Sequence, residues 1–239
     1  MPLMRIGRSG DARGNVRPLR AAILGLCLMG GALACSSSGS TGVQADESNR
    51  FLRLAMVQME QGQTSQALES AREAVKRDPK NAEAHHYLGL IHMNLSEYDQ
   101  AMEHLQEAVK IDPHYTDAHN ALGVIYKEKK LYDKALKEFQ AALADKTYRT
   151  PEKIQLNIGN LYLDQGVLSE AQRSFEKAVS LNPKYLLGYI GLGTTYQRMG
   201  KPDLASAQFK KVIELAPTGP EAERAKQLLS TGGGARSGS

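Results

Sequence analysis

Apolar and polar positions along most of the chain repeat with a period of 34 residues. The prolines mark this period, because Pro79 and Pro113 are 34 residues apart and so are Pro183 and Pro217. The gap between Pro113 and Pro183 is 70 residues, which is two periods plus an insertion of two. A fixed period of this length is typical of a supersecondary unit that stacks on copies of itself. The pattern therefore predicts a row of about five stacked units.

Each unit has the composition of two helices that pack closely together. Glycines between the two halves, such as Gly62, Gly166 and Gly200, predict turns, and each proline ends a second helix because its ring removes a backbone donor and clashes with the preceding turn. Small residues recur in both halves, where the two helices must approach each other, and large side chains stand opposite them. The small residues are Gly89, Gly123, Gly159 and Gly193 in the first halves, and Ala67, Ala101, Ala135, Ala171 and Ala205 in the second halves.

This arrangement resembles the tetratricopeptide repeat, which places a large residue, Leu-Gly and an aromatic on a first helix and Ala, Phe, Ala and Pro on a second. The resemblance implies an all-α fold: a right-handed superhelical solenoid of about five helix-turn-helix repeats plus a C-terminal capping helix. We expect the repeat domain to span residues 48–230, with the capping helix after Pro220 and a disordered tail over residues 231–239. The third unit shows the pattern well, with His119, Leu122, Gly123, Tyr126, Ala135, Phe139 and Ala142.

A different pattern precedes the repeats. The uncharged stretch Ala21–Ala34 follows five arginines, and a helix of its length would span only about 21 Å of a ~30 Å hydrocarbon core. A basic region, a short apolar region and a small-residue exit predict a signal peptide over residues 1–34 that is removed. The exit Ala32-Leu33-Ala34-Cys35 resembles a bacterial lipobox, with Ala32 where the usual pattern has Leu.

The lipobox resemblance implies that Cys35 is acylated and becomes the first residue of the mature protein. Several acyl chains would anchor it firmly in a membrane. Ser36 after the Cys resembles an outer-membrane address, so we expect the protein in the outer membrane, lipid-anchored and facing the periplasm. The Ser- and Gly-rich residues 36–47 predict a flexible tether, which with the lipidated Cys35 makes a segment over residues 35–47.

The net charge of the whole chain misleads about its partners. The formal charge is +4, and the segment 1–34 carries all of it, with five arginines against one aspartate. The remaining chain has 25 basic and 25 acidic residues, so no excess of positive charge steers it toward nucleic acid. We expect no nucleic-acid partner.

The residues that could carry chemistry are few. Among the six histidines, His85 and His119 occupy the large-residue position of the repeat and His92 the aromatic position, so packing explains them without a metal. The Gly191-Leu192-Gly193 element lies within an expected helix rather than in a loop after a strand, where a nucleotide-binding glycine motif belongs. The sequence therefore predicts a protein that is not an enzyme, with no metal, no cofactor and no small-molecule substrate.

In tetratricopeptide repeats the first helices line a concave face, and partner-binding side chains occupy fixed positions on it. The resemblance assigns an apolar, Met-rich groove, typical of adaptable protein contacts, to the N-terminal units. Relatives that clamp a terminal carboxylate use Lys and Asn where this groove begins with Leu and Met, which disfavours that ligand. The alternative is that an N-terminal capping turn or the tether covers the groove. The predicted groove residues are Leu52, Met56, Met59, His86, Leu90, Met93 and Val124, and the later units place Leu156, Asn160, Leu163, Ile190, Thr194 and Gln197 at the same positions.

The two-residue insertion carries a second resemblance. Its residues Tyr148, Thr150, Pro151, Glu152, Asn157 and Gly159 look like the Y-x-T-P-E…N-x-G segment of type IV pilus assembly lipoproteins, the pilotins. Thr150 as N-cap and Pro151 at the first helical position would restart the helix after a loop. The resemblance implies that the protein binds subunits of the type IV pilus secretin and promotes their multimerisation in the outer membrane, with outer-membrane lipid holding the acylated Cys35.

Two other functions stay open at this point. The first is a repeat lipoprotein that scaffolds cell-wall enzymes or outer-membrane barrel assembly, because such proteins share the lipidation and the repeats. The second is an enzyme that uses the histidine cluster, for which the sequence offers no further ligand or base.

Overall fold

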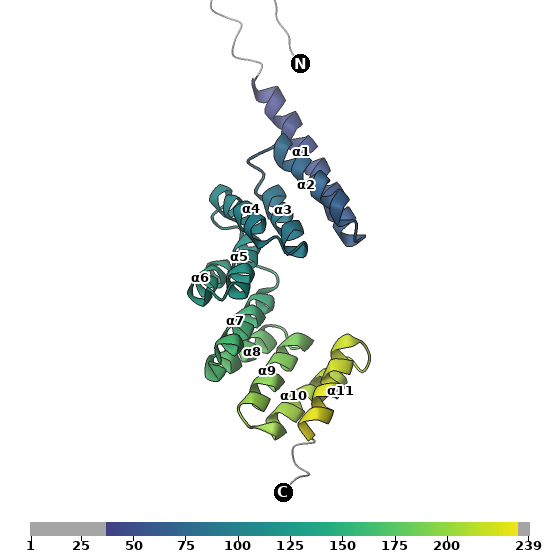
Figure 1. Cartoon of the computed structure of the whole chain (residues 1–239), viewed down its shortest axis with the longest axis vertical. Coiled ribbons are helices and arrows are strands. Elements are labelled where there is room, and N and C mark those ends of the chain that lie inside the picture. Colours follow the sequence, from purple (N-terminus) through teal and green to yellow (C-terminus); the bar gives the residue numbers. More distant parts are fainter. Residues whose placement is uncertain (1–36, 234–239) are drawn as a thin grey trace, which may run out of the picture. The chain divides into compact units, whose positions relative to one another are not determined.

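The computed structural model describes residues 37–233, and this part of the chain contains eleven α-helices (Figure 1). Their bounds are α1 Ser37–Glu60, α2 Thr64–Arg77, α3 Ala82–Asn94, α4 Tyr98–Ile111, α5 Thr116–Glu128, α6 Tyr132–Ala144, α7 Pro151–Gln165, α8 Leu168–Leu181, α9 Leu186–Arg198, α10 Pro202–Leu215 and α11 Pro220–Gly233. The predicted all-α fold is confirmed.

The helices pack in the order of the chain, as a repeat array requires. The helices α3 and α4, α5 and α6, α7 and α8, and α9 and α10 form hairpins, and each second helix also packs on the first helix of the next unit. Successive first helices contact each other from α3 to α11, and α11 contacts both helices of the fifth unit. Each unit therefore relies on its neighbours to bury its apolar surface, and α11 covers the end of the row.

Prolines end the second helices at the expected places. Helix α2 ends at Arg77 and α4 at Ile111, each two residues before a proline. An aspartate stands between the end of each helix and the proline. In the first case it stabilises the turn, since Oδ1 of Asp78 accepts a hydrogen bond from the backbone N–H of Lys80 at 2.9 Å. Pro151 stands at the start of α7, where the missing N–H is not needed. Thr150 is the N-cap residue there, but its side chain makes no capping hydrogen bond, contrary to the sequence-based expectation.

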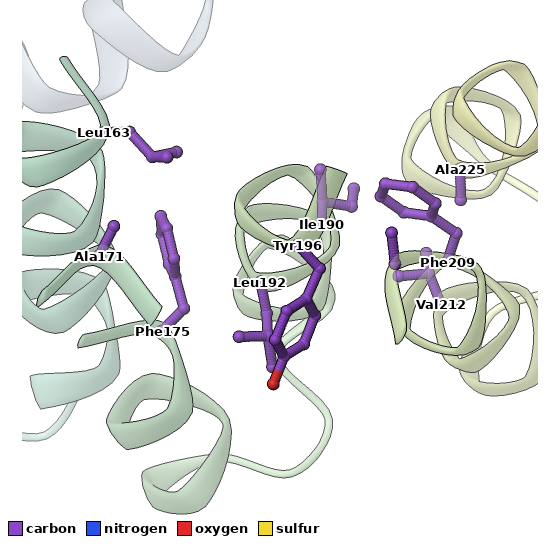
Figure 2. Packing of buried hydrophobic residues seen from close by; sticks show 10 residues of the cluster. Leu163, Ala171, Phe175, Ile190, Leu192, Tyr196, Phe209, Val212 and Ala225 are labelled. Carbon is purple, nitrogen blue, oxygen red and sulfur yellow. The ribbon is translucent and has the colours of Figure 1, made fainter. Parts of the chain in front are cut away.

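Phenylalanine rings packed on glycines form the core of the last units. A Cβ atom added to Gly159 would lie 2.6 Å from the Cε1 atom of Phe175, and one added to Gly193 would lie 2.5 Å from that of Phe209. Both rings are fully buried, and Figure 2 shows them on the two sides of the α9 residues Ile190 and Leu192. The predicted close approach of the paired helices is therefore real, and it depends on the absence of side chains at these glycines.

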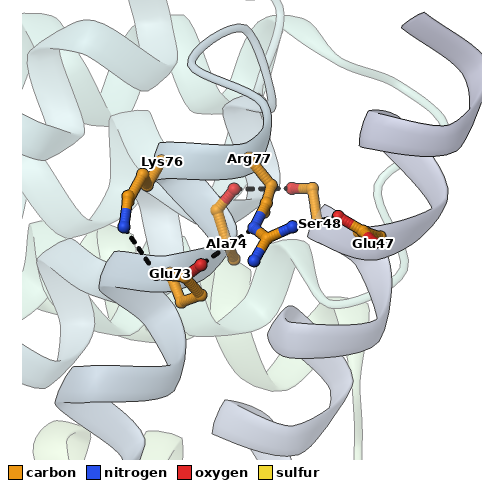
Figure 3. Close-up of polar contacts among 6 residues, drawn as sticks. All are labelled: Glu47, Ser48, Glu73, Ala74, Lys76 and Arg77. Carbon is orange, nitrogen blue, oxygen red and sulfur yellow. Dashed lines mark hydrogen bonds and ion pairs between the residues drawn. The ribbon is translucent and has the colours of Figure 1, made fainter. Parts of the chain in front are cut away.

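The first helix begins earlier than the sequence predicts. Residues 37–47, which we expected as a flexible tether, belong to α1. Contacts to α2 hold the middle of this helix: the buried Ser48 hydroxyl donates to the backbone oxygen of Ala74 at 2.8 Å, and Arg77 pairs with both Glu47 and Glu73 (Figure 3). Because a helix adds one backbone hydrogen bond per residue once it has formed, this anchored segment extends back to Ser37.

The remaining predicted domain boundaries can be compared with the structure only in part. Helix α11 continues to Gly233, three residues beyond the expected end of the repeat domain. The predicted signal peptide and Cys35 lie outside the residues that the structure describes. Among the helices of the described segment, none is both long and apolar enough to cross a membrane.

Candidate functional site

The first helices carry the predicted groove residues, and the structure divides these residues into two groups. Leu52 and His86, expected to face a partner, are buried, with 3% and 7% of their surface exposed. The remaining residues are half-buried: Met56, Met59, Leu90, Met93 and Val124. The N-terminal stripe therefore offers less free apolar surface than the sequence predicts.

Small alanines explain why Leu52 is buried. The side chain belongs to a core cluster with Ala74 of α2 and Ala84 of α3, and Met56 packs against the same cluster. Met59 packs against a neighbouring cluster that includes Ala55 and Leu88. Because alanines leave space between three helices, the long side chains of α1 fill it instead of facing solvent.

His86 is buried because two tyrosines enclose it. Its ring meets those of Tyr87 and Tyr115 edge to face, with centroids 5.4 Å and 5.2 Å apart, and its Nδ1 atom lies 3.3 Å from the Tyr115 hydroxyl. Burial lowers the pKa of His86 to about 4, and the nearby carboxylate of Asp117 opposes this shift only in part. His86 is thus a neutral packing residue at pH 7.

The same repeat positions in the C-terminal units are also divided, since Leu163 and Ile190 are buried whereas Leu156, Asn160 and Thr194 are half-buried. A cavity of about 240 Å³ has walls from the first helices α7 and α9 and from α11, and we name it the α7–α9–α11 cavity. Its polar groups are Asn160, Thr194 and the exposed Arg224, and no ion pair of Arg224 with an acidic residue forms within residues 37–233. Its apolar walls come from Leu156, Leu163, Leu187 and Ile190, with Gly191 beside them.

The sequence identified most of this cavity but missed its cation. Leu156, Asn160, Leu163, Ile190 and Thr194 occupy the repeat positions from which relatives bind their partners. Arg224 lies beyond the repeats, on the capping helix, so no repeat position could have pointed to it. The cavity can accept an apolar side chain together with a carboxylate. The apolar walls would contact the side chain, and the guanidinium and the two hydrogen-bonding side chains beside them would bind the carboxylate.

The residues of the insertion motif hold neighbouring units together. The Tyr148 hydroxyl donates to Oδ1 of Asp117 on α5 at 2.6 Å, and Asn157 Nδ2 donates to Oδ1 of Asn120, also on α5, at 2.9 Å. Burial raises the pKa of Tyr148, and the hydrogen bond to Asp117 raises it further, so the phenol stays protonated.

Glu152 of the same motif contacts the end of α8 within its own unit. Its side chain is buried, with 7% of the residue exposed, and Oε1 accepts a hydrogen bond from Asn182 Nδ2 at 3.2 Å. Gly159 admits the ring of Phe175, as described above. Four of the six motif residues therefore have structural partners in the third or fourth unit.

Three histidines come together near α3 and α4, but in a packing arrangement. The rings of His92 and His104 stack with centroids 5.6 Å apart, and His85 Nδ1 lies 3.3 Å from His104 Nδ1. Burial, with further contributions from His85 and His92, lowers the pKa of His104. Within the described residues no three histidine, cysteine or acidic side chains are placed to hold a metal ion.

Comparison with protein families decides what these repeats are. Models of the tetratricopeptide repeat match residues 52–116, 94–147, 152–185 and 188–218. The chain belongs to the tetratricopeptide repeat family. These repeats mediate protein–protein interaction and typically form non-catalytic scaffolds, which agrees with the sequence-based interpretation at this level.

Solved structures of other tetratricopeptide repeat proteins share this fold. PilW, described as a widely conserved type IV pilus biogenesis factor, is 26% identical with a TM-score of 0.70, and the match covers 79% of this chain and 91% of PilW. PilF of Pseudomonas aeruginosa is 19% identical with a TM-score of 0.69, covering 82% and 95%, which shows the fold alone. A MamA structure is 26% identical with a TM-score of 0.59, covering 72% and 96%. No curated protein sequence matches the chain.

Proposed function

We propose that this tetratricopeptide repeat protein is a type IV pilus biogenesis factor that binds secretin subunits and promotes their multimerisation in the outer membrane. The observation that carries the proposal is the likeness to PilW, which extends over most of both chains. The insertion between the third and fourth units supports it, because that segment resembles the pilotins in sequence. The protein then acts by binding and positioning its partner.

The proposal includes a lipid anchor at Cys35. It rests on the lipobox resemblance and on the short apolar stretch before it. Acylation at Cys35 would keep the repeats at the periplasmic face of the outer membrane, where secretin subunits arrive. A Cys35→Ser variant should then leave the membrane fraction and appear in the soluble periplasm.

Within the proposal, the α7–α9–α11 cavity and the half-buried groove residues contact the partner. A secretin segment that presents an apolar side chain beside a carboxylate would match Arg224, Asn160 and the apolar walls. The charge of Arg224 makes a sharp test, because this residue is exposed and its replacement should leave the fold intact.

The experiment replaces the chromosomal gene with variants and measures heat-resistant secretin multimers, surface pili and motility. Deletion should abolish all three, and Arg224→Glu should reduce multimers at least fivefold while the circular dichroism spectrum stays unchanged. Lys210→Glu is the matched control, since Lys210 is an exposed residue on the second helix α10. Normal multimers in the deletion strain would contradict the proposed function, and normal multimers in Arg224→Glu would contradict the cavity as the contact.

A further inference from the structure

Three of the units place a ring at the same point, against the turn that precedes their first helix. In each case a ring nitrogen or phenol hydrogen-bonds to the backbone oxygen of the proline six residues earlier. The ring fills the corner between the turn and the helix. The pairs are His85–Pro79 at 3.2 Å, His119–Pro113 at 3.1 Å and Tyr189–Pro183 at 3.1 Å.

The fourth unit lacks this ring. Gln155 occupies the equivalent position, three residues before Ile158-Gly159, as His119 stands three residues before Leu122-Gly123. A cavity of about 420 Å³ lies beside Gln155, and we name it the insertion cavity. Its apolar walls are Leu143, Tyr148, Pro151 and Leu181.

The connection before the fourth unit also differs from the other connections, because it contains the two-residue insertion. Six residues, 145–150, connect α6 to α7, whereas four connect α2 to α3, α4 to α5 and α8 to α9. The longer connection takes Tyr148 toward Asp117, and the proline of the other turns is absent, because Thr147 stands in its place. A cavity of about 290 Å³ also lies beside His119 in the preceding unit, but the insertion cavity is larger and has residues of the longer connection, such as Lys146 and Tyr148, in its wall.

Two lysines carry positive charge at the rim of the insertion cavity, and the ammonium of one of them, Lys146, donates to the backbone oxygen of Leu143 at 3.3 Å. The Asp145 carboxylate is already satisfied, since Oδ1 accepts from the backbone N–H and hydroxyl of Thr147 and Oδ2 accepts from the Thr116 hydroxyl. These hydrogen bonds lower the pKa of Asp145 and keep it ionised. Lys146 and Lys177 also line the cavity, and within the described segment neither forms an ion pair with an acidic side chain.

We propose that the insertion cavity docks an extended, acidic peptide segment of a protein partner whose aromatic side chain enters beside Gln155. The partner's ring would fill the corner that the chain's own rings fill in three other units, and its carboxylates would pair with Lys146 and Lys177. This surface shares no residue with the α7–α9–α11 cavity and goes beyond the proposed secretin contact.

The size and exposure of the insertion cavity suit such an occupant. Its volume lies within the range of about 300–1,000 Å³ that is usual for ligand sites, and an aromatic anchor in a pocket is a frequent centre of binding energy. Leu181 is 52% exposed at its edge, so a bound segment would cover apolar surface there.

A direct test measures fluorescence anisotropy of labelled acetyl-Asp-Glu-Phe-Glu-Asp-amide against the purified full chain in detergent. We expect saturable binding that weakens as salt is added. The same peptide with Ala in place of Phe should bind at least tenfold more weakly. Gln155→Tyr restores the ring that other units carry, so this variant should fold normally and lose at least tenfold in affinity.

Two further variants keep the test decisive if Gln155→Tyr does not fold. Leu181→Ser changes an exposed wall residue, and Lys146→Ala with Lys177→Ala should remove most of the salt dependence. Lys210→Ala is the control for a lost lysine elsewhere and should bind like the unchanged protein.

Three results would overturn the proposal. The first is absence of saturable binding, and the second is equal affinity in well-folded Gln155→Tyr or Leu181→Ser. The third is self-association of the unchanged chain in sedimentation experiments that Gln155→Tyr abolishes, since the occupant would then be a second copy. None of these measurements involves the secretin, so their failure is separate from failure of the proposed function.

Discussion

The ring of Phe175 lies so close to Gly191 that a Cβ atom at Gly191 would be 2.4 Å from Cε1 of the ring. Gly193, two residues later, makes the same kind of approach to Phe209 of α10, the helix that forms a hairpin with α9. The Gly191-Leu192-Gly193 element therefore has a packing explanation: each glycine admits a ring from a different second helix, α8 or α10.

Gly191→Ala should destabilise the protein. The added methyl group would overlap the Phe175 ring, and overpacking of this kind costs about 1–3 kcal/mol, partly offset by the better helix propensity of Ala. Urea unfolding followed by circular dichroism should show a lower midpoint. Gly42→Ala is the matched control, because nothing lies within 4 Å of a Cβ at that position, and it should be neutral or slightly stabilising. Equal midpoints for the two variants would contradict the close contact.

Ser48→Ala should loosen the first helix from the second. The Ser48 hydroxyl is fully buried, donates to Ala74 O and accepts from Asn81 Nδ2 at 3.0 Å. Its removal deletes this hydrogen bond, while Ala74 O still accepts from the backbone N–H of Asp78 at 3.1 Å, so the cost should be about 0.5–1.5 kcal/mol. Hydrogen exchange should speed up in α1 and α2 more than in α9 and α10, whereas Ser65→Ala, an exposed position of α2, should change neither.

Stability should fall on mild acidification because of His86. Its folded-state pKa of about 4 lies below the unfolded value of about 6.5, so the folded state favours the neutral ring. This contribution is fully present above pH 6.5 and is lost as pH falls from 6.5 toward 4, by up to about 3 kcal/mol. His86→Phe, which keeps a ring but cannot be protonated, should therefore show a smaller loss of unfolding free energy between pH 7 and pH 4.5.

The variant is needed because other histidines also titrate. The hydrogen bond to Glu138 raises the pKa of His119, so this residue stabilises the fold at acidic pH and opposes the effect of His86. His114→Gln, which replaces an exposed imidazole, is the control for a histidine substitution. A pH profile that is the same in His86→Phe and in the unchanged protein would show that the buried ring is not responsible.

Tyr148→Phe should distinguish the contribution of Tyr148 to stability from its contribution to peptide binding. Loss of the 2.6 Å hydrogen bond to Asp117 should lower the unfolding free energy by about 1–2 kcal/mol. Differential scanning calorimetry measures this change. Because the ring itself remains in the wall of the insertion cavity, the peptide affinity should change less than in Gln155→Tyr.

Much of the fold could be predicted from the sequence because repeated packing leaves a repeated pattern. Positions such as Gly123, Ala135 and Pro113 report on contacts that recur in most units, and several copies confirm one another. The helix over residues 37–47 was not predicted, because the Ser- and Gly-rich composition of this segment indicates local flexibility. The contacts that hold α1, the Glu47–Arg77 ion pair and the Ser48–Ala74 hydrogen bond, are made with α2, far away in the sequence.

The candidate site was harder to predict because a repeat position does not determine how much of a side chain stays exposed. Leu52 is buried because Ala74 and Ala84 leave space for it, and His86 is buried because Tyr115 closes over it. From the sequence, the place of the insertion cavity could be found only by comparing the units, because Gln155 stands where three other units have a ring. That difference is visible in the sequence, but the cavity itself is not, because its walls come from α6, α7 and α8 and from the longer α6–α7 connection.

The α7–α9–α11 cavity has walls from three successive layers at one end of the row. Terminal elements of such arrays open locally more readily than the middle, and opening of α11 alone would remove Arg224 and one wall. A ligand in this cavity therefore binds only the closed end, and by mass action it slows the fraying of the last helices. Ligand binding in this cavity and the closed state of the C-terminal cap are thus thermodynamically coupled, so each one favours the other.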